Sequence, residues 1–192
     1  MGDQTTRGLQ VEAPVSTFYL WAQLLGVPGS FVYYSREILT FQVAGPEIDA
    51  VIAAMTPVLA VGVGAVAVLA ALKARRGASV AQLLPVTATA LVVVFIALNK
   101  VGSPQYLCWL VPPIVLGLLY ERRAWTRPAF AVLALSALTQ LVYPLLYADV
   151  LLAQPVGVAV LTVRNALLVV VGVWMVVRLA RVPVRTPASV PA

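Results

Sequence analysis

The densest group of side chains able to do chemistry stands between two apolar stretches, at residues 99–109, which read NKVGSPQYLCW. Lys100 offers a point charge that can meet a phosphate at a membrane surface. Asn99 and Gln105 offer amides that can hydrogen-bond sugar hydroxyls or phosphate oxygens. A turn residue and two aromatic residues, able to stack on a sugar ring or an isoprenoid, complete the group: Ser103, Tyr106 and Trp109. The same residue types also suit a helix end, a tight turn and an aromatic belt, so a structural loop is an equally open interpretation.

A second polar group lies near the N-terminus, in the segment RGLQVE at residues 7–12. Its side chains, Arg7, Gln10 and Glu12, can line a substrate pocket outside the membrane. The alternative is a solvated N-terminal tail, which composition alone favours.

Arg164 and Asn165 form a third polar group, about ten residues into an apolar stretch at 155–177. An arginine at that depth is costly and normally faces a partner or a polar cavity. Its partner would be Glu12, Asp149 or a lipid phosphate. A structural ion pair, or snorkelling of the side chain to the surface, is the alternative to a functional role.

Several classes of chemistry lack the residues they need. The sequence has no histidine and a single cysteine, Cys108, and it shows no phosphate-cradling glycine loop, metal-spaced ligand set or nucleophilic triad. The net charge of +6 comes from short basic clusters beside apolar runs, which argues against nucleic acid as a partner. We therefore expect no metal site, no cofactor and no nucleic acid, and leave a metal requirement open.

The elements that must position these residues are apolar helices. Of the 192 residues, 61% are apolar and 10% are charged, whereas an ordinary soluble domain is about 25% charged. With apolar runs of about 20 residues, this predicts an all-α integral membrane protein with about five transmembrane helices. The predicted spans lie within a transmembrane region at 50–178 and cover residues 50–72, 80–98, 107–120, 128–147 and 155–177.

The segments that flank this region differ from it. Within residues 1–49, the apolar stretch 17–27 would reach only about 16 Å as a helix, so it predicts an amphipathic helix lying at the membrane interface. Residues 31–43 are rich in β-branched and aromatic residues and predict a short outer hairpin. The Pro/Val/Arg-rich tail, residues 179–192, is expected to be disordered.

The distribution of basic residues predicts the orientation. Nine of them follow the ends of predicted spans on one side, against Arg7, Arg36 and Lys100 on the other. The C-terminus is therefore expected in the cytoplasm of a multi-pass cell-membrane protein, and residues 1–49 on the non-cytoplasmic side. The nine are Lys73, Arg75, Arg76, Arg122, Arg123, Arg127, Arg178, Arg181 and Arg185. Because nothing before residue 49 directs export, we expect the chain to be the C-terminal part of a longer protein.

At these motifs the chain resembles a known family. NKVGSPQYLCW is similar to the NKV-x-[ST]-x-QY-x-x-W stretch of the GT-C mannosyltransferases that use polyprenyl-phosphate mannose, found in the first GPI mannosyltransferase of eukaryotes and in actinobacterial membrane α-mannosyltransferases. RGLQVEA resembles the RGLQ-[IV]-ES segment of the bacterial members, with Ala13 where they carry serine. The order of elements between the motifs is also similar, and the resemblance covers roughly residues 7–180.

The resemblance implies a transferase that moves a hexose, usually mannose, from a polyprenyl-phosphate donor to a lipid or glycan acceptor on the non-cytoplasmic face. It places five residues of the first group in the donor and active-site region and three of the second group along the same cavity. They are Asn99, Lys100, Ser103, Gln105 and Tyr106, with Arg7, Gln10 and Glu12. The family's catalytic carboxylate sits in an earlier outer loop, so no catalytic residue is assigned here.

Two other functions remain open on the sequence. The first is a flippase-like or accessory membrane protein that binds polyprenyl phosphate without transferring a sugar. The second is a small transporter, which we rank last because the spans lack coupling carboxylates and repeat symmetry.

Overall fold

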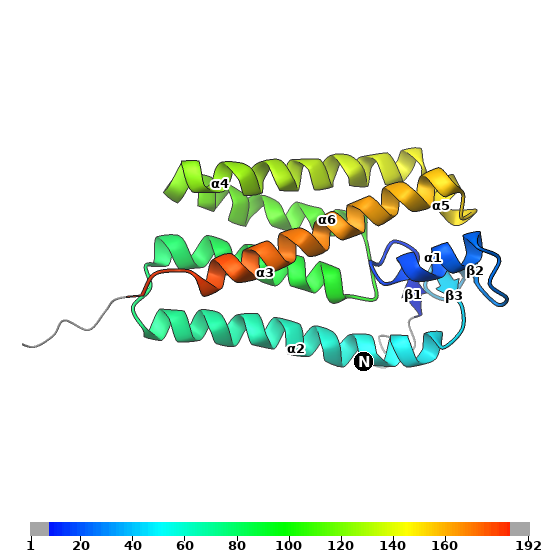
Figure 1. Cartoon of the computed structure of the whole chain (residues 1–192), viewed down its shortest axis with the longest axis horizontal. Coiled ribbons are helices and arrows are strands. Elements are labelled where there is room, and N and C mark those ends of the chain that lie inside the picture. The colour runs from blue at the N-terminus through cyan, green and yellow to red at the C-terminus, as the bar shows by residue number, and fades with distance from the viewer. Residues whose placement is uncertain (1–7, 185–192) are drawn as a thin grey trace, which may run out of the picture.

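The structure is a computed structural model that describes residues 8–184, and it is dominated by apolar helices (Figure 1). Within those residues, four helical stretches are long and apolar enough to cross a membrane, as expected of an all-α multi-pass membrane protein. They are α2 (Ile48–Arg75), α3 (Val80–Leu98), the stretch Pro104–Leu145, and α6 (Pro155–Ala180). Arg7 and Arg185 lie outside the described residues.

Helix α3 stands at the centre of the bundle, where it packs against α2, α4 (Val111–Gln140) and α6. Its buried positions Val86, Ala90 and Val93 recur at helical spacing, so one stripe of α3 faces its neighbours. Leu135 of α4 and Leu168 of α6 are fully buried in the same apolar cluster. Helix α2 is the most exposed of the four stretches, with only 11% of its most apolar window buried.

The stretch Pro104–Leu145 contains a break at the position where the sequence predicted a loop between two spans. It begins with the short 3-10 helix η1 (Pro104–Leu110), continues as α4 and ends in the π-helical turn η2 (Leu141–Leu145). At Glu121 the backbone leaves the helical region, with φ −142° and ψ 62°. The two halves of α4 lie side by side (Figure 1).

The two sides of this break pack against each other. Gly117, before Glu121, is in contact with the Trp125 ring after it, and a Cβ at Gly117 would overlap that ring. By length and hydropathy, the stretch Pro104–Leu145 is a single candidate span. The described residues therefore contain four candidate spans, whereas the sequence predicted about five.

Residues 8–47 form a small folded unit, here called the cap, at one end of the bundle (Figure 1). The predicted hairpin is confirmed as β2 (Phe31–Ser35) and β3 (Thr40–Ala44). The predicted helix is confirmed as α1 (Ser16–Leu24), which ends before Gly26 at φ +74°. A short strand, β1 (Leu9–Gln10), was not expected; it pairs antiparallel with β3 and gives the sheet order β1-β3-β2.

The sheet has one apolar face and one polar face. Leu9, Val43 and Val32 stand in one row across the three strands and belong to an apolar cluster with residues of α1, α5 (Tyr147–Leu151) and α6. The next row along the strands, Gln10, Gln42 and Tyr33, points to the opposite face. The apolar face therefore fixes the cap on the bundle, and the polar face is left to line a site.

Candidate functional site

The structure separates the predicted site residues into three neighbouring groups. One group lines a polar pocket under the cap: Gln10, Ser103, Gln105 and Tyr106. A second lines a pocket beside α2 and α3: Asn99 and Lys100. A third is buried where α6 meets the cap: Glu12, Arg164 and Asn165.

The loop that follows α3 docks directly on strand β1. The main-chain N–H of Gln10 donates to the carbonyl of Lys100 at 3.0 Å, and the N–H of Gly102 donates to Oε1 of Gln10 at 3.1 Å. The loop is shaped locally by Asn99, whose Oδ1 accepts the N–H of Val101 at 3.0 Å. A side chain at residue 102 would overlap the main chain of Glu12, so this close approach requires glycine. Two segments about 90 residues apart thus form one surface.

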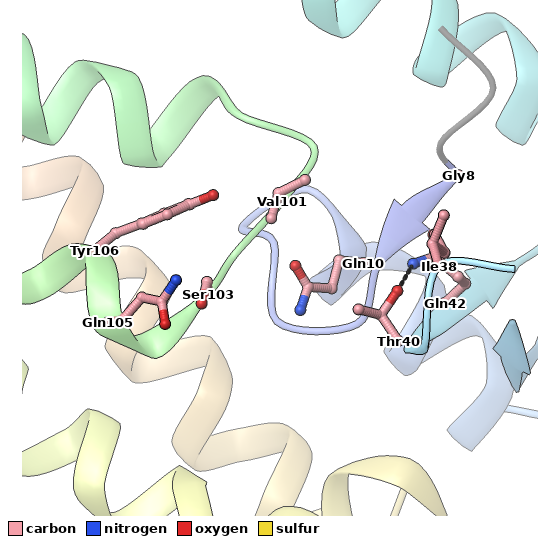
Figure 2. A pocket seen from close by; sticks show the side chains of 9 residues that line it. All are labelled: Gly8, Gln10, Ile38, Thr40, Gln42, Val101, Ser103, Gln105 and Tyr106. Carbon is pink, nitrogen blue, oxygen red and sulfur yellow. Dashed lines mark hydrogen bonds between the residues drawn. The ribbon is translucent and has the colours of Figure 1, made fainter. Parts of the chain in front are cut away.

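The polar pocket lies between that loop and the polar face of the sheet, and its volume is about 180 Å³ (Figure 2). Its walls are amides, hydroxyls and a few apolar groups. The described residues that line it are Gly8, Gln10, Ile38, Thr40, Gln42, Val101, Ser103, Gln105 and Tyr106. Four of these nine come from the predicted set.

Gln42 and Thr40 are the polar lining residues that sequence reasoning missed. Gln42 is 2% exposed, and its Nε2 donates to Oγ1 of Thr40 at 2.7 Å (Figure 2). Polar and apolar residues alternate in the strand TFQVA, so Thr40 and Gln42 lie on one face of the sheet and Phe41 and Val43 on the other. This pattern is typical of a sheet whose polar face is solvated. In the structure, the loop after α3 docks on β1 and lies across the pocket from this face.

Tyr106 belongs to an aromatic cluster beside the pocket. Its ring stacks on Trp109 at a centroid distance of 4.7 Å and meets Phe95 edge-on at 5.9 Å. Its hydroxyl end points toward Val101 (Figure 2). The stack with Trp109 covers one face of Tyr106, so the pair fixes the start of η1 next to the pocket.

Lys100 points into a different space from Gln105. With Asn99, it lines a pocket of about 270 Å³ together with residues of α2 and α3, and it is 9% exposed. The loop 99–103 therefore separates a pocket that holds a cation from one lined by amides and hydroxyls. The other residues around Lys100 are Met55, Thr56, Leu59, Phe95 and Leu98.

Arg164 and Asn165 connect α6 to the cap through a buried hydrogen-bond network. Arg164, 2% exposed, donates to Oδ1 of Asn165 at 2.7 Å, to Oγ1 of Thr139 at 3.2 Å and to the main-chain carbonyl of Glu12 at 3.4 Å. Asn165 donates in turn to Oγ1 of Thr17 in α1 at 2.8 Å. These residues do not line the polar pocket, so their position indicates that they hold the cap in place.

Glu12 lies in the same buried layer. Tyr147 donates its hydroxyl to Oε1 of Glu12 at 2.7 Å, while Oε2 is buried with no hydrogen-bond partner among the described residues. Burial raises the pKa of the Glu12 carboxyl above its ordinary value, against the lowering effect of the Tyr147 hydrogen bond and the Arg164 charge. Burial also raises the pKa of Tyr147, so its hydroxyl keeps the proton that it donates. Glu12 is therefore poorly placed to act as a base on a ligand in the polar pocket.

Metal-binding residues do not gather anywhere in the described part of the chain. Residues 8–184 contain no group of three or more His, Cys, Asp or Glu side chains that could hold a metal ion. Cys108 is a free, exposed thiol in η1. The chemistry that these residues offer is hydrogen bonding from amides and hydroxyls, with one cation nearby.

Together the fold and the site define a multi-helix membrane protein with a polar pocket where a small cap meets the helical bundle. Comparisons with models of protein families, with curated proteins and with solved structures found no match for this chain.

Proposed function

We propose that this protein is part of a membrane glycosyltransferase that binds a polyprenyl-phosphate hexose, of which mannose is the expected sugar, at the junction of cap and bundle. The observation that carries the proposal is the polar pocket itself. Gln10 comes from one motif of the sequence and Ser103 and Gln105 from another, and all three line it. A polar pocket at the end of apolar helices suits a substrate with a sugar head and an isoprenoid tail.

The two pockets on either side of the loop 99–103 supply different chemistry for such a donor. Gln105 and Ser103 offer hydrogen bonds to sugar hydroxyls, while Lys100, in the neighbouring pocket, offers a positive charge to a phosphate. The acceptor would be a lipid or a glycan that reaches the same end of the bundle. We assign no catalytic base, because none of the nine described residues that line the polar pocket is a carboxylate.

The proposed location is the cell membrane, with the cap on the non-cytoplasmic side and the C-terminus in the cytoplasm. The support is the arrangement of charge along the bundle. Arg75 and Arg76 end α2, and Arg178 lies in the last turn of α6, far from the cap (Figure 1). Positive charge that gathers at one end of a helical bundle is typical of its cytoplasmic end.

The direct test is sugar transfer by membranes that carry the gene product, supplied with polyprenyl-phosphate mannose labelled in the sugar. We expect Gln105→Ala and Lys100→Ala each to lower transfer about tenfold or more, because each removes a polar contact made to the donor. The matched control is Gln140→Ala, an exposed glutamine in α4 that lines neither pocket. Transfer that is unchanged by both pocket variants would overturn the site assignment.

A second candidate function is an accessory protein that binds polyprenyl phosphate without transferring the sugar. This function needs no general base, so it is compatible with a pocket whose nine described lining residues include no carboxylate. Under this alternative, membranes with the wild-type protein bind the labelled donor and transfer nothing. In that case Lys100→Ala weakens binding of the labelled donor, and there is no sugar transfer for it to change.

A further inference from the structure

The side-chain oxygen of Gln42, Oε1, is a buried acceptor without a hydrogen-bond partner among the described residues. Six buried side-chain atoms in the described part of the chain have no hydrogen-bond partner, and Oε1 of Gln42 is the one whose residue lines the polar pocket. The amide is held in place because Nε2 donates to Oγ1 of Thr40 at 2.7 Å. A buried amide oxygen without a partner is costly, and one that belongs to the wall of a pocket is a candidate to accept a hydrogen bond from a ligand there.

Gly8 lies close against that oxygen and leaves no room for a side chain. A Cβ placed on Gly8 would lie 2.7 Å from Oε1 of Gln42 and 3.4 Å from the hydroxyl of Tyr33. Any residue larger than glycine at this position would therefore cover the acceptor. Gln10 stands directly opposite Gln42 in the adjacent antiparallel strand, so the two amides face the same space from neighbouring strands.

The chemistry of the lining selects a neutral ligand. None of the nine described lining residues carries a formal charge; the polar ones are three glutamines and three hydroxyl residues. A phosphate or carboxylate would find no cation among them to compensate for its lost hydration. A hydroxyl group both donates and accepts hydrogen bonds, so a polyol can meet Oε1 of Gln42 and the side chain of Ser103 together. The volume of about 180 Å³ is below that of pockets for larger ligands, which suits one sugar ring.

We infer that Gln42, with Gln10 beside it, binds the hydroxyl groups of a single neutral hexose unit. The polar pocket is then the sugar site of the donor, and the phosphate lies outside it. Identifying that hexose as part of a polyprenyl-phosphate donor rests on the proposed function, whereas its neutral polyol character rests on the pocket alone.

The test measures binding of methyl α-mannoside to the purified full chain in detergent, by saturation-transfer NMR with titration. We expect Gln42→Leu to weaken binding about tenfold, the equivalent of one lost hydrogen bond. Gly8→Ala should weaken it similarly, because its methyl group covers Oε1. Gln23→Leu makes the same change in α1, away from the pocket and at another glutamine with a buried unpartnered Oε1, and should leave binding unchanged.

Folding and ligand class are checked in the same samples. Leucine at residue 42 removes the unpartnered oxygen but also the hydrogen bond from Nε2 to Thr40, so the melting temperature of the Gln42→Leu variant should stay close to that of wild type. Inorganic phosphate should not displace the methyl mannoside. Equal hexoside affinity in wild type, Gln42→Leu and Gly8→Ala, or displacement by phosphate at equal concentration, would overturn the inference.

The outcome separates this inference from the proposed function. If the hexoside binds through Gln42 but membranes transfer no sugar from polyprenyl-phosphate mannose, the inference stands and the transferase proposal fails. If transfer proceeds and Gln42→Leu leaves its KM for the donor unchanged, the transferase proposal stands and the role of Gln42 fails.

Discussion

The guanidinium of Arg164, buried within α6, donates to the main-chain carbonyl of Glu12 at a distance of 3.4 Å. The sequence predicted a charged partner, with the carboxylate of Glu12 among the choices, but no ion pair of Arg164 occurs within the described residues. Its other hydrogen bonds go to Thr139 and Asn165. The arginine therefore fixes the path of the cap backbone through neutral acceptors, which makes its loss a test of how the cap is held.

Arg164→Leu should loosen the cap. The substitution leaves three buried oxygen acceptors without this donor, and we expect a loss of about 2–4 kcal/mol in stability. Arg164→Lys should recover only part of it, because one ammonium group cannot reach all three acceptors in the same geometry. The measurement is the melting temperature in detergent, together with the rate of proteolysis in the cap.

The matched control is Arg127→Leu, at an exposed position of α4, where the change should stay within about 0.5 kcal/mol. If Arg164→Leu melts at the same temperature as Arg127→Leu, the buried network does not hold the cap.

Glu12 should make the stability of the cap depend on pH. Burial raises the pKa of its carboxyl above the ordinary value of 4.5, so the folded state favours the protonated form. The stability that this contributes is fully present below about pH 4.5 and is lost as the pH rises through the higher pKa of the folded state. We expect the melting temperature of wild type to fall across this window and that of Glu12→Gln to change less.

Asp49→Asn, at an exposed carboxylate in the first turn of α2, is the comparison for removing one acidic charge. At pH values above the folded-state pKa of Glu12, the Glu12→Gln variant should be more stable than wild type, since glutamine is neutral without binding a proton. An unchanged pH profile in Glu12→Gln would show that another group controls the transition.

The sequence predicts the elements of this fold better than their contacts. The apolar helices, the hairpin and α1 each leave a local signal, because hydropathy, β-branched residues and glycine act within a few residues. Strand β1 is only two residues long, and Val43, which pairs with its Leu9, lies far along the chain. No local sequence pattern therefore predicts this strand. The break at Glu121 was interpreted as a loop between spans, because its charged neighbours suit a loop as well as a tight helical hairpin.

The candidate site was predicted in the same uneven way. Gln10, Ser103 and Gln105 could be selected because polar residues between apolar runs are conspicuous. Gln42 could not, because an alternating strand normally turns such a residue to water. Lys100 was grouped with Gln105 by proximity in sequence, yet the turn at 101–103 directs the two side chains into different pockets.

Gly102→Ala should separate the loop after α3 from the cap. The new Cβ would overlap the main chain of Glu12 and Ala13, which has no side-chain freedom to move away. We expect a loss of about 1–3 kcal/mol or more, together with loss of hexoside binding. Gly64→Ala is the control, because a Cβ on this α2 residue meets nothing within 4 Å. The stability of that variant should be unchanged or up to about 1 kcal/mol higher, because alanine is the better helix former. Equal melting temperatures for the two variants would show that the loop does not rest on the cap.

The orientation proposed for the bundle can be tested by labelling single cysteines in intact cells. Cys108 is exposed, so it is first replaced by serine to give a background without thiols. Glu37→Cys then places an exposed thiol in the turn of the cap hairpin, and Arg75→Cys places one at the opposite end, where α2 finishes. Because the basic end should stay in the cytoplasm, a membrane-impermeant maleimide should label Glu37→Cys on intact cells and Arg75→Cys only after lysis. The reverse pattern would put the polar pocket on the cytoplasmic side, where an enzyme that uses donors presented outside the cell could not reach them.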